Sequence, residues 1–336
     1  MGEERVRAAF SAQAGWGERL DRTSEVGRRL LDWPGDPAPE ADNVPARFCA
    51  ALQYCAQTGA ARALAGLYPP APPPADDQLW AAIQPLLDGD AALVHPWLDS
   101  PPQTNEVGRS AVLMSGLLAI AARFPLPLHL FELGSSAGLN LLLDRYAYDL
   151  GGLPAGDPAS PLKLSPTWSG PPPPQADVEV AERRGVDLRP ADTLRDGDKL
   201  LAYVWPGHDS RRDRLRKALA IAADPPPVAA GDAADWLETT LPRRTPGAVR
   251  VVMHSIAFQY FAEQTRRRIE ALVERLGAEA DEEAPLAWLR FEQEPGEEAA
   301  TLKLRCWPGE DRLLAHAHSH GASVQWLATE SGPASR

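Results

Sequence analysis

The stretch from Leu128 to Tyr146 constrains the fold of this chain more than any other segment. Residues 128–133 form an apolar run with an acid near its end, which is typical of a buried strand. The small residues of 134–138 follow, and 139–146 has the apolar spacing of an amphipathic helix start. The sequence therefore predicts a strand, a tight turn and a helix.

A turn of this kind is suited to binding a ligand. Small residues let the backbone approach a ligand closely, and the first turn of a helix offers unpaired N–H groups. Glu132, at the carboxyl end of the strand, is placed to accept hydrogen bonds from the hydroxyls or an amine of that ligand. We predict a ligand site here, and the alternative is a strand-to-helix turn without a ligand.

Two classes of enzyme use a strand, a turn and a helix arranged in this way. Gly134–Gly138 satisfies the G-x-S-x-G pattern of α/β-hydrolases, in which Ser136 is the nucleophile. The spacing Glu132-x-Gly134-x-x-x-Gly138 resembles the E/D-x-G-x-G-x-G first motif of class I S-adenosylmethionine-dependent methyltransferases. The dinucleotide fingerprint G-x-G-x-x-G is excluded, because Ser136 occupies the position of its second glycine.

Composition and charge indicate which kinds of molecule the protein is expected to bind. A net charge of −12 argues against a protein that binds nucleic acid through phosphate contacts. The N-terminus lacks the apolar core of a signal peptide, and no run approaches the ~20 apolar residues of a membrane span. Three cysteines without a C-x-x-C pair disfavour a disulfide framework. We expect a cytoplasmic protein with a small-molecule substrate and neither a nucleic-acid nor a membrane partner.

The spacing of apolar residues divides the chain into two predicted domains. Residues 1–125 have helical spacing throughout, whereas 126–330 alternates strand and helix patterns. Residues 151–175 are rich in proline and glycine and are expected to form a long structureless insertion, as lids and binding loops do. From residue 286 onward, short strands separated by turns predict an antiparallel end. The predicted fold is an α/β sheet preceded by a helical N-terminal domain.

Polar residues follow the later strand patterns as well. Asp187 ends one strand, Asp232 follows the next, and His254 and Ser255 end the strand that begins at Val249. In an open α/β sheet, ligands bind outside the carboxyl ends of the strands, so His254 and Ser255 are expected to face the site. Asp232 could also cap the helix that follows, and His254 could be a core histidine.

Two further segments carry polar residues at regular spacing. Thr104 or Asn105 could cap a helix that runs to Arg123, on which Glu106 and Arg109 share a face, either as a solvated ion pair or as part of the site. His316, His318 and His320 would share one face of a strand at intervals of about 6.8 Å. Three histidines in line cannot close a tetrahedral site, so we predict polar or substrate-facing residues and no metal.

The motifs together resemble a bacterial family known only as a domain of unknown function. The resemblance rests on 104–109, 132–140, 182–187, 204–206, 231–233 and 254–255. It implies the Rossmann-like fold of class I methyltransferases, with antiparallel C-terminal strands. It also implies a cofactor, S-adenosylmethionine, and a set of residues that bind it, namely Glu132, Gly134, Ser135, Ser136, Ala137, Gly138, Asn140, Asp187 and Asp232.

In this interpretation the 134–138 turn holds the methionine moiety, Asp187 the ribose and Asp232 the adenine. His254 is the candidate general base for methyl transfer to a small molecule. Two other functions stay open. One is an α/β-hydrolase with Ser136 as nucleophile, an acid such as Asp232, and His254 or a histidine of 316–320 as base, in the chain order of that fold. The other is a non-catalytic S-adenosylmethionine or nucleotide sensor.

Overall fold

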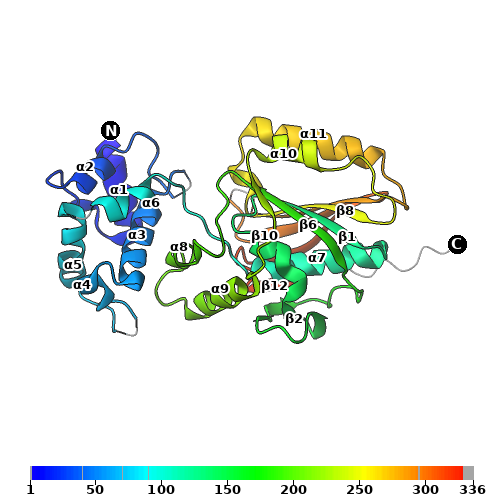
Figure 1. Ribbon diagram of the computed structural model, residues 1–336, viewed down its shortest axis with the longest axis horizontal. Coiled ribbons are helices and arrows are strands. Elements are labelled where there is room, and N and C mark those ends of the chain that lie inside the picture. The colour runs from blue at the N-terminus through cyan, green and yellow to red at the C-terminus, as the bar shows by residue number, and fades with distance from the viewer. Residues whose placement is uncertain (1, 40, 70, 90, 294–295, 328–336) are drawn as a thin grey trace. The chain divides into compact units, whose positions relative to one another are not determined.

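The chain forms two compact units. The structure is a computed structural model that describes residues 2–39, 41–69, 71–89, 91–293 and 296–327 (Figure 1). One unit comprises Met1–Thr104 and Arg195–Arg212, and the other comprises Asn105–Leu194 and Asp213–Arg336. This division differs from the predicted boundary at residue 125, because helix α7 (Arg109–Arg123) packs on the sheet of the second unit. Residues 328–330 of the predicted second domain lie outside the described residues.

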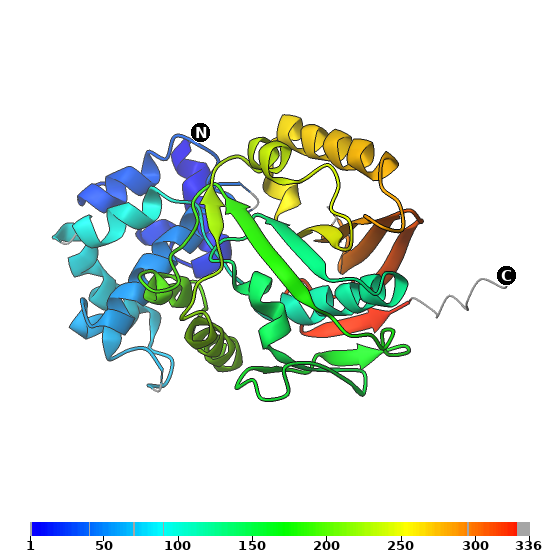
Figure 2. The ribbon, with the colours of Figure 1, turned by 45° about the vertical axis from the view of Figure 1, so that its right-hand side comes forward.

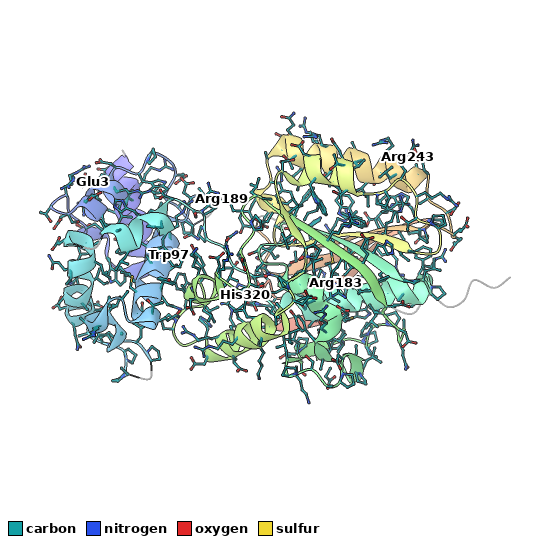
Figure 3. All side chains as sticks on the ribbon, in the orientation of Figure 1. Glu3, Trp97, Arg183, Arg189, Arg243 and His320 are labelled. Atoms are coloured by element: carbon teal, nitrogen blue, oxygen red, sulfur yellow. The ribbon has the colours of Figure 1, made fainter. Side chains whose placement is uncertain are left out.

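The first unit is helical, as the apolar spacing predicts. Its elements are α1 (Gly2–Ala14), η1 (Gly17–Arg19), α2 (Glu25–Leu31), α3 (Val44–Thr58), α4 (Arg62–Ala65), α5 (Asp76–Asp88), α6 (Ala91–Leu98) and α8 (Gly197–Ala202). Helix α8 comes from far along the chain. The buried Gln53 donates a hydrogen bond to the Leu201 carbonyl at 3.2 Å, and the Tyr203 ring lies 5.6 Å from that of Trp97, which is labelled in Figure 3. These contacts fasten the later segment to the helical core.

The second unit is built on a mixed sheet. Its strands are β1 (Leu128–Leu133), β2 (Ala147–Leu150), β3 (Leu153–Gly156), β4 (Lys163–Leu164), β5 (Thr167–Ser169), β6 (Val180–Asp187), β7 (Val228–Ala230), β8 (Val249–Ser255), β9 (Leu286–Glu292), β10 (Ala300–Trp307), β11 (Asp311–Ala317) and β12 (Ser323–Trp326). Within the described residues, nine of them pair in the order β5-β12-β11-β10-β9-β8-β1-β6-β7, and β3-β2-β4 form a small second sheet. The run from β7 to β9 is parallel, and β9 to β12 is an antiparallel meander, as predicted.

Helices cover both faces of the large sheet. Helices α10 (Ala233–Thr240) and α11 (Glu263–Ala278) enclose one core with apolar residues of β1, β8 and β9. Helix α7 packs on the other face, and Figures 1 and 2 both show it across the sheet from α11. Because helices cover both faces, β8 is buried along its whole length, with the apolar residues Val251–Met253 at its centre.

The order in which successive strands are added to the sheet reverses at β1. From β1 the connections lead outward to β6 and β7 on one side, whereas β8 and β9 lie on the other side. Such a switch in strand order opens a crevice at the carboxyl ends of the two central strands, where α/β proteins bind ligands. The predicted turn and the end of β8 both lie at this edge.

Three segments differ from the sequence expectations. The insertion 151–175 is not structureless, because it supplies β3, β4 and β5, and β5 extends the large sheet beside β12. The predicted helix after the turn is a 3₁₀ helix, η2 (Leu139–Arg145), whose Leu139 and Leu143 carbonyls accept from the hydroxyls of Tyr146 and Tyr148. The sequence pattern of 256–276 predicts one long helix after β8, but that helix, α11, begins at Glu263 and is preceded by a separate turn, η3 (Phe258–Tyr260).

Helix α9 (Asp209–Ile221) completes the described elements and begins in the first unit and ends in the second. None of the helices in the described ranges combines the length and apolar character that crossing a bilayer requires.

Candidate functional site

The 134–138 turn has a backbone that only small residues tolerate. Gly134, Ser136 and Gly138 have φ values of +70°, +54° and +71°. A Cβ atom at Gly134 would lie 2.6 Å from that of Ala257, and one at Gly138 would lie 2.7 Å from Cγ of Pro226. Both glycines are therefore required by neighbouring segments of the protein. Ser136 is the exception, because a non-glycine residue in the left-handed region is strained, and such residues gather at functional sites.

Asp187 fastens the turn to the end of β6. Its Oδ2 accepts a hydrogen bond from the backbone N–H of Ser136 at 2.9 Å, and its Oδ1 accepts one from the N–H of Arg189, labelled in Figure 3, at 2.9 Å. The structure thus brings together two of the predicted site segments, which are far apart in the sequence. Each carboxylate oxygen has a second lone pair, so the side chain keeps acceptor capacity.

The backbone N–H groups at the start of η2 are not all free to bind a ligand. The Leu139 N–H donates to Oδ1 of Asn105 at 3.0 Å, and Oδ1 of Asn140 accepts from the Ser110 hydroxyl at 2.7 Å. Asn105 therefore caps η2, whereas the sequence suggested that it caps the helix that ends at Arg123. Asn140 is buried and holds η2 against α7, so its side chain lies inside the fold.

Ser135 and Ala137 also direct their side chains into the protein. Ser135 is buried and donates from Oγ to the Glu132 carbonyl at 2.8 Å, next to Gly185 of β6. Ala137 is buried as well. Both predicted cofactor residues could contact a ligand only through their backbone.

Two buried polar atoms at the turn have no hydrogen-bond partner among the described residues. They are Oε2 of Glu132 and Oγ of Ser136. Burial, followed by the negative charge of Asp187, raises the pKa of Glu132 from 4.5 to about 8, although the guanidinium of Arg109 acts in the opposite direction. A buried polar atom without a partner costs free energy, so both atoms mark a place where a ligand group is favourable.

Glu106 and Arg109 are buried, which excludes the solvated ion pair that the sequence allowed. Arg109 donates from Nε to the Ser319 carbonyl at 2.9 Å and from Nη1 to the Ser255 carbonyl at 3.0 Å. Glu106 accepts from the Gly108 N–H at 3.0 Å. The first residue of α7 thereby joins the end of β8 to the loop after β11.

Asp232 caps α10, as the alternative interpretation proposed. Its Oδ1 accepts from the N–H groups of Ala234 and Asp235, and its Oδ2 accepts from the Thr265 hydroxyl at 2.8 Å. Burial acts to raise the pKa of Asp232, but the hydrogen bonds outweigh it, and the pKa is lowered overall. The carboxylate is ionised at neutral pH and joins the N-terminal ends of α10 and α11.

His254 lies on the opposite face of the sheet from Glu132. Phe131 and Val252 both face the core under α10 and α11, and side chains alternate along a strand. His254 therefore shares this face, whereas Glu132 points toward the α7 side. A ligand lying across the carboxyl ends of β1 and β8 would be needed to reach both.

The sequence analysis missed Glu292, the partner of His254. Oε1 of Glu292 lies 2.6 Å from Nδ1 of His254 and accepts from the N–H groups of Ala257 and Phe258, both at 3.1 Å. The only available signal was an acid at the end of the strand that precedes the meander, and nothing in its local pattern tied it to His254.

The three histidines near the C-terminus do not form one row. His316 lies on β11, but His318 and His320 lie in the following turn, where Nδ1 of His318 accepts from the His320 N–H at 3.1 Å. In the described part of the chain, no group of three or more His, Cys, Asp or Glu side chains is arranged to hold a metal ion.

Comparison with known families identifies the chain at the family level. The family described as "uncharacterized protein conserved in bacteria (DUF2332)" matches residues 11–326. The chain belongs to this family. The match includes the helical unit as well as the sheet, so both units of this DUF2332 protein are part of the family pattern. A search of curated proteins found no match.

Proposed function

We propose that this DUF2332 protein is an S-adenosylmethionine-dependent methyltransferase that acts on a small molecule. The proposal takes the sheet to be the Rossmann-like sheet of class I methyltransferases, with its antiparallel end formed by β10 to β12. The parallel order β7-β6-β1-β8-β9 and the switch at β1 support it. The single observation that carries the proposal is the meeting of the 134–138 turn, Asp187 and the unpartnered Glu132 Oε2 at that switch.

The donor set fits the cofactor. A protonated amine carries donors but no acceptor. Its positive charge would favour the ionised form of Glu132, whose buried Oε2 has no hydrogen-bond partner among the described residues and would then accept from the amine. Asp187 would accept from the ribose hydroxyls through its remaining lone pairs, and Asp232 would accept from the adenine amine in the same way. The backbone of 134–138 would lie against the methionine moiety. When bound, S-adenosylmethionine supplies a methyl group on a sulfonium, which an acceptor must approach in line.

Calorimetric titration with S-adenosylmethionine and S-adenosylhomocysteine tests the proposal. We expect saturable binding at ~1–100 µM, or roughly −8 to −5.5 kcal/mol. Binding should be lost in Asp187→Ala and retained in Ser136→Ala. Asp157→Ala is the matched control, because Asp157 is exposed and also accepts from a backbone N–H, that of Ala159. Absence of binding to the folded wild type would refute the proposal, and binding without turnover on any acceptor would favour the sensor.

The strained backbone of Ser136 favours one second candidate, an α/β-hydrolase. The nucleophile of that fold sits on a sharp, strained turn between strand and helix, and Ser136 has a φ of +54° and an unpartnered, buried Oγ. Labelling with a serine-reactive phosphonate separates the two functions. Stoichiometric modification that disappears in Ser136→Ala would support the hydrolase, and the methyltransferase predicts none.

A further inference from the structure

Four buried polar atoms on neighbouring residues of β8 and β9 have no hydrogen-bond partner among the described residues. They are Nε2 of His254, Oε2 of Glu292 and Nε1 of Trp288, which we call the β8–β9 cluster, and Nε of Arg290, whose guanidinium lies over the Trp288 ring at 4.8 Å. Nδ1 of His254 contacts Glu292 at 2.6 Å, and the His254 ring meets the Trp288 ring edge-on at 6.0 Å. The three side chains of the cluster lie on the sheet face that packs against α11, away from Glu132.

Glu292 determines which nitrogen of His254 carries the proton. Burial acts to raise the pKa of Glu292, but the hydrogen bonds from His254, Ala257 and Phe258 outweigh it and lower the pKa overall. The ionised carboxylate can only accept, so Nδ1 of His254 must be the donor. In the neutral ring, Nε2 then has a free lone pair.

The local backbone is shaped to hold Glu292 in place. Ile256 has a φ of +48°, which is a genuine outlier for a β-branched residue, and its N–H donates to the Phe291 carbonyl at 2.7 Å. The chain reversal at Ile256 directs the next two N–H groups to the same oxygen of Glu292. Strain that is retained at the end of a central strand points to a function for this arrangement.

The donors and acceptors of the cluster define what it can bind. Nε2 of His254 and Oε2 of Glu292 accept, whereas Nε1 of Trp288 donates. A hydroxyl group fits Nε2 of His254 and Nε1 of Trp288, because it donates its one proton to Nε2 and its oxygen accepts from Nε1, while Oε2 of Glu292 is left to accept from another donor. An ammonium group has no lone pair for Trp288, and a thiol is a weak acceptor.

The cover over the cluster is slight. The Phe258 ring stacks on His254 with centroids 4.7 Å apart, and Phe258 belongs to η3, none of whose residues is buried. Tyr260 of the same turn is 69 % exposed. Displacing this turn gives up the packing of Phe258 on the core and its N–H bond to Glu292, but it disturbs less buried surface than opening a core element would.

We propose that the β8–β9 cluster binds the hydroxyl of the methyl acceptor, with Glu292 as the positioning residue and Nε2 of His254 as the base. This inference rests on the proposed methyltransferase function. The hydroxyl oxygen bonds to the methyl carbon as the carbon–sulfur bond breaks, with that electron pair left on sulfur. The hydroxyl proton passes to Nε2, and Trp288 donates to the oxygen that is methylated. The product is a methyl ether.

The tautomer of His254 is the first test, read by NMR of protein labelled with ¹⁵N-histidine and assigned with His254→Gln. The wild type should carry its proton on Nδ1. Glu292→Gln keeps an oxygen acceptor and should retain this tautomer, whereas Glu292→Leu should lose it. A proton on Nε2 in the neutral wild-type ring would overturn the proposal, and a merely structural Glu292 would not produce this pattern.

Titration with phenol, with benzene as the matched compound without a hydroxyl, is the second test. Phenol should shift the His254 Nε2 and Trp288 indole signals saturably, and benzene should not. Trp288→Phe should reduce the phenol response at least severalfold. Trp326→Phe is the control, because Nε1 of Trp326 is also buried with no hydrogen-bond partner among the described residues but lies on β12. Equal responses to phenol and benzene would refute hydroxyl binding.

Calorimetry with S-adenosylmethionine separates this inference from the function on which it rests. If the cofactor binds but phenol acts no differently from benzene, the inference fails and the methyltransferase survives. If phenol binds as expected and the cofactor does not, the methyltransferase fails, and with it the role of His254 in methyl transfer.

Discussion

The carboxylate of Asp187 accepts a hydrogen bond from the backbone N–H of Ser136 at 2.9 Å, across the carboxyl ends of two neighbouring strands. This bond fixes the strained residue of the turn to β6. The same carboxylate is the proposed ribose ligand, so the turn and the ligand share one side chain. Stability and binding should therefore respond together when it is changed.

Removing this carboxylate should destabilise the fold as well as weaken binding. A hydrogen bond to a charged group contributes about 1.5–3 kcal/mol, so Asp187→Ala should lower the free energy of unfolding by about that amount. Asp187→Asn keeps one oxygen acceptor and should lose less. Urea denaturation measures the loss, with Asp157→Ala, which removes an exposed bond, as the control. A loss in Asp187→Ala no larger than that in the control would show that the turn does not depend on this bond.

The buried Glu132 predicts an unusual dependence of stability on pH. Its pKa is raised from 4.5 to about 8 in the folded protein. Between these values the folded state retains a proton that the unfolded state has released, so stability is fully present below the unfolded pKa and falls as pH rises toward 8. The slope from this group is at most about 1.4 kcal/mol per pH unit.

Glu132→Gln removes this titration and is the variant that checks it. Urea denaturation of both proteins between pH 5 and 8, a range chosen to lie within the predicted window, should show the wild type losing stability relative to the variant as pH rises. The gap between the two curves cancels the contributions of all other groups that titrate alike. A constant gap over this range would contradict the raised pKa.

The cap on η2 gives a third prediction. Asn105→Ala removes the acceptor for the Leu139 N–H and should cost about 0.5–2 kcal/mol in unfolding free energy. Asn105→Asp keeps an oxygen there and should cost less. The exchange rate of the Leu139 amide hydrogen reports the bond directly, and an unchanged rate in Asn105→Ala would disprove the cap.

The sequence was most informative where one segment decides its own structure. Strands β1 and β8 were predictable, because a strand buried on both faces is rich in apolar residues. The antiparallel end was predictable, because a strand buried on one face alternates apolar and polar residues. Asp187 was singled out only through a family resemblance, and the parallel pairing of β1 with β6 places it beside the turn.

Features that depend on distant partners were not predictable. The 3₁₀ form of η2 depends on hydroxyls of Tyr146 and Tyr148, and the pairing of His254 with Glu292 depends on the register of β8 and β9. The insertion 151–175 was misjudged because β5 is held by a pairing with β12, far along the chain. Its own composition, rich in proline and glycine, gives no sign of that partner.

Substitution of Gly134 separates two reasons for a glycine in the turn. Gly134→Ala places a side chain both at a φ of +70° and 2.6 Å from Cβ of Ala257. Gly247→Ala tests the positive φ alone, since Gly247 has a φ of +78° with nothing within 4 Å of an added Cβ. The control should cost roughly 1–2 kcal/mol, and Gly134→Ala about 1–3 kcal/mol more from the steric overlap.

A second substitution that restores the space completes this comparison. Ala257→Gly removes the methyl group that the new side chain would meet, so the double variant should recover much of the loss in Gly134→Ala, as a double-mutant cycle in urea would measure. Equal losses in the two single glycine variants, or additive losses in the double variant, would mean that conformation alone selects this glycine. Recovery would show that the turn and the end of β8 are in direct contact, so that a ligand bound to one would affect the other.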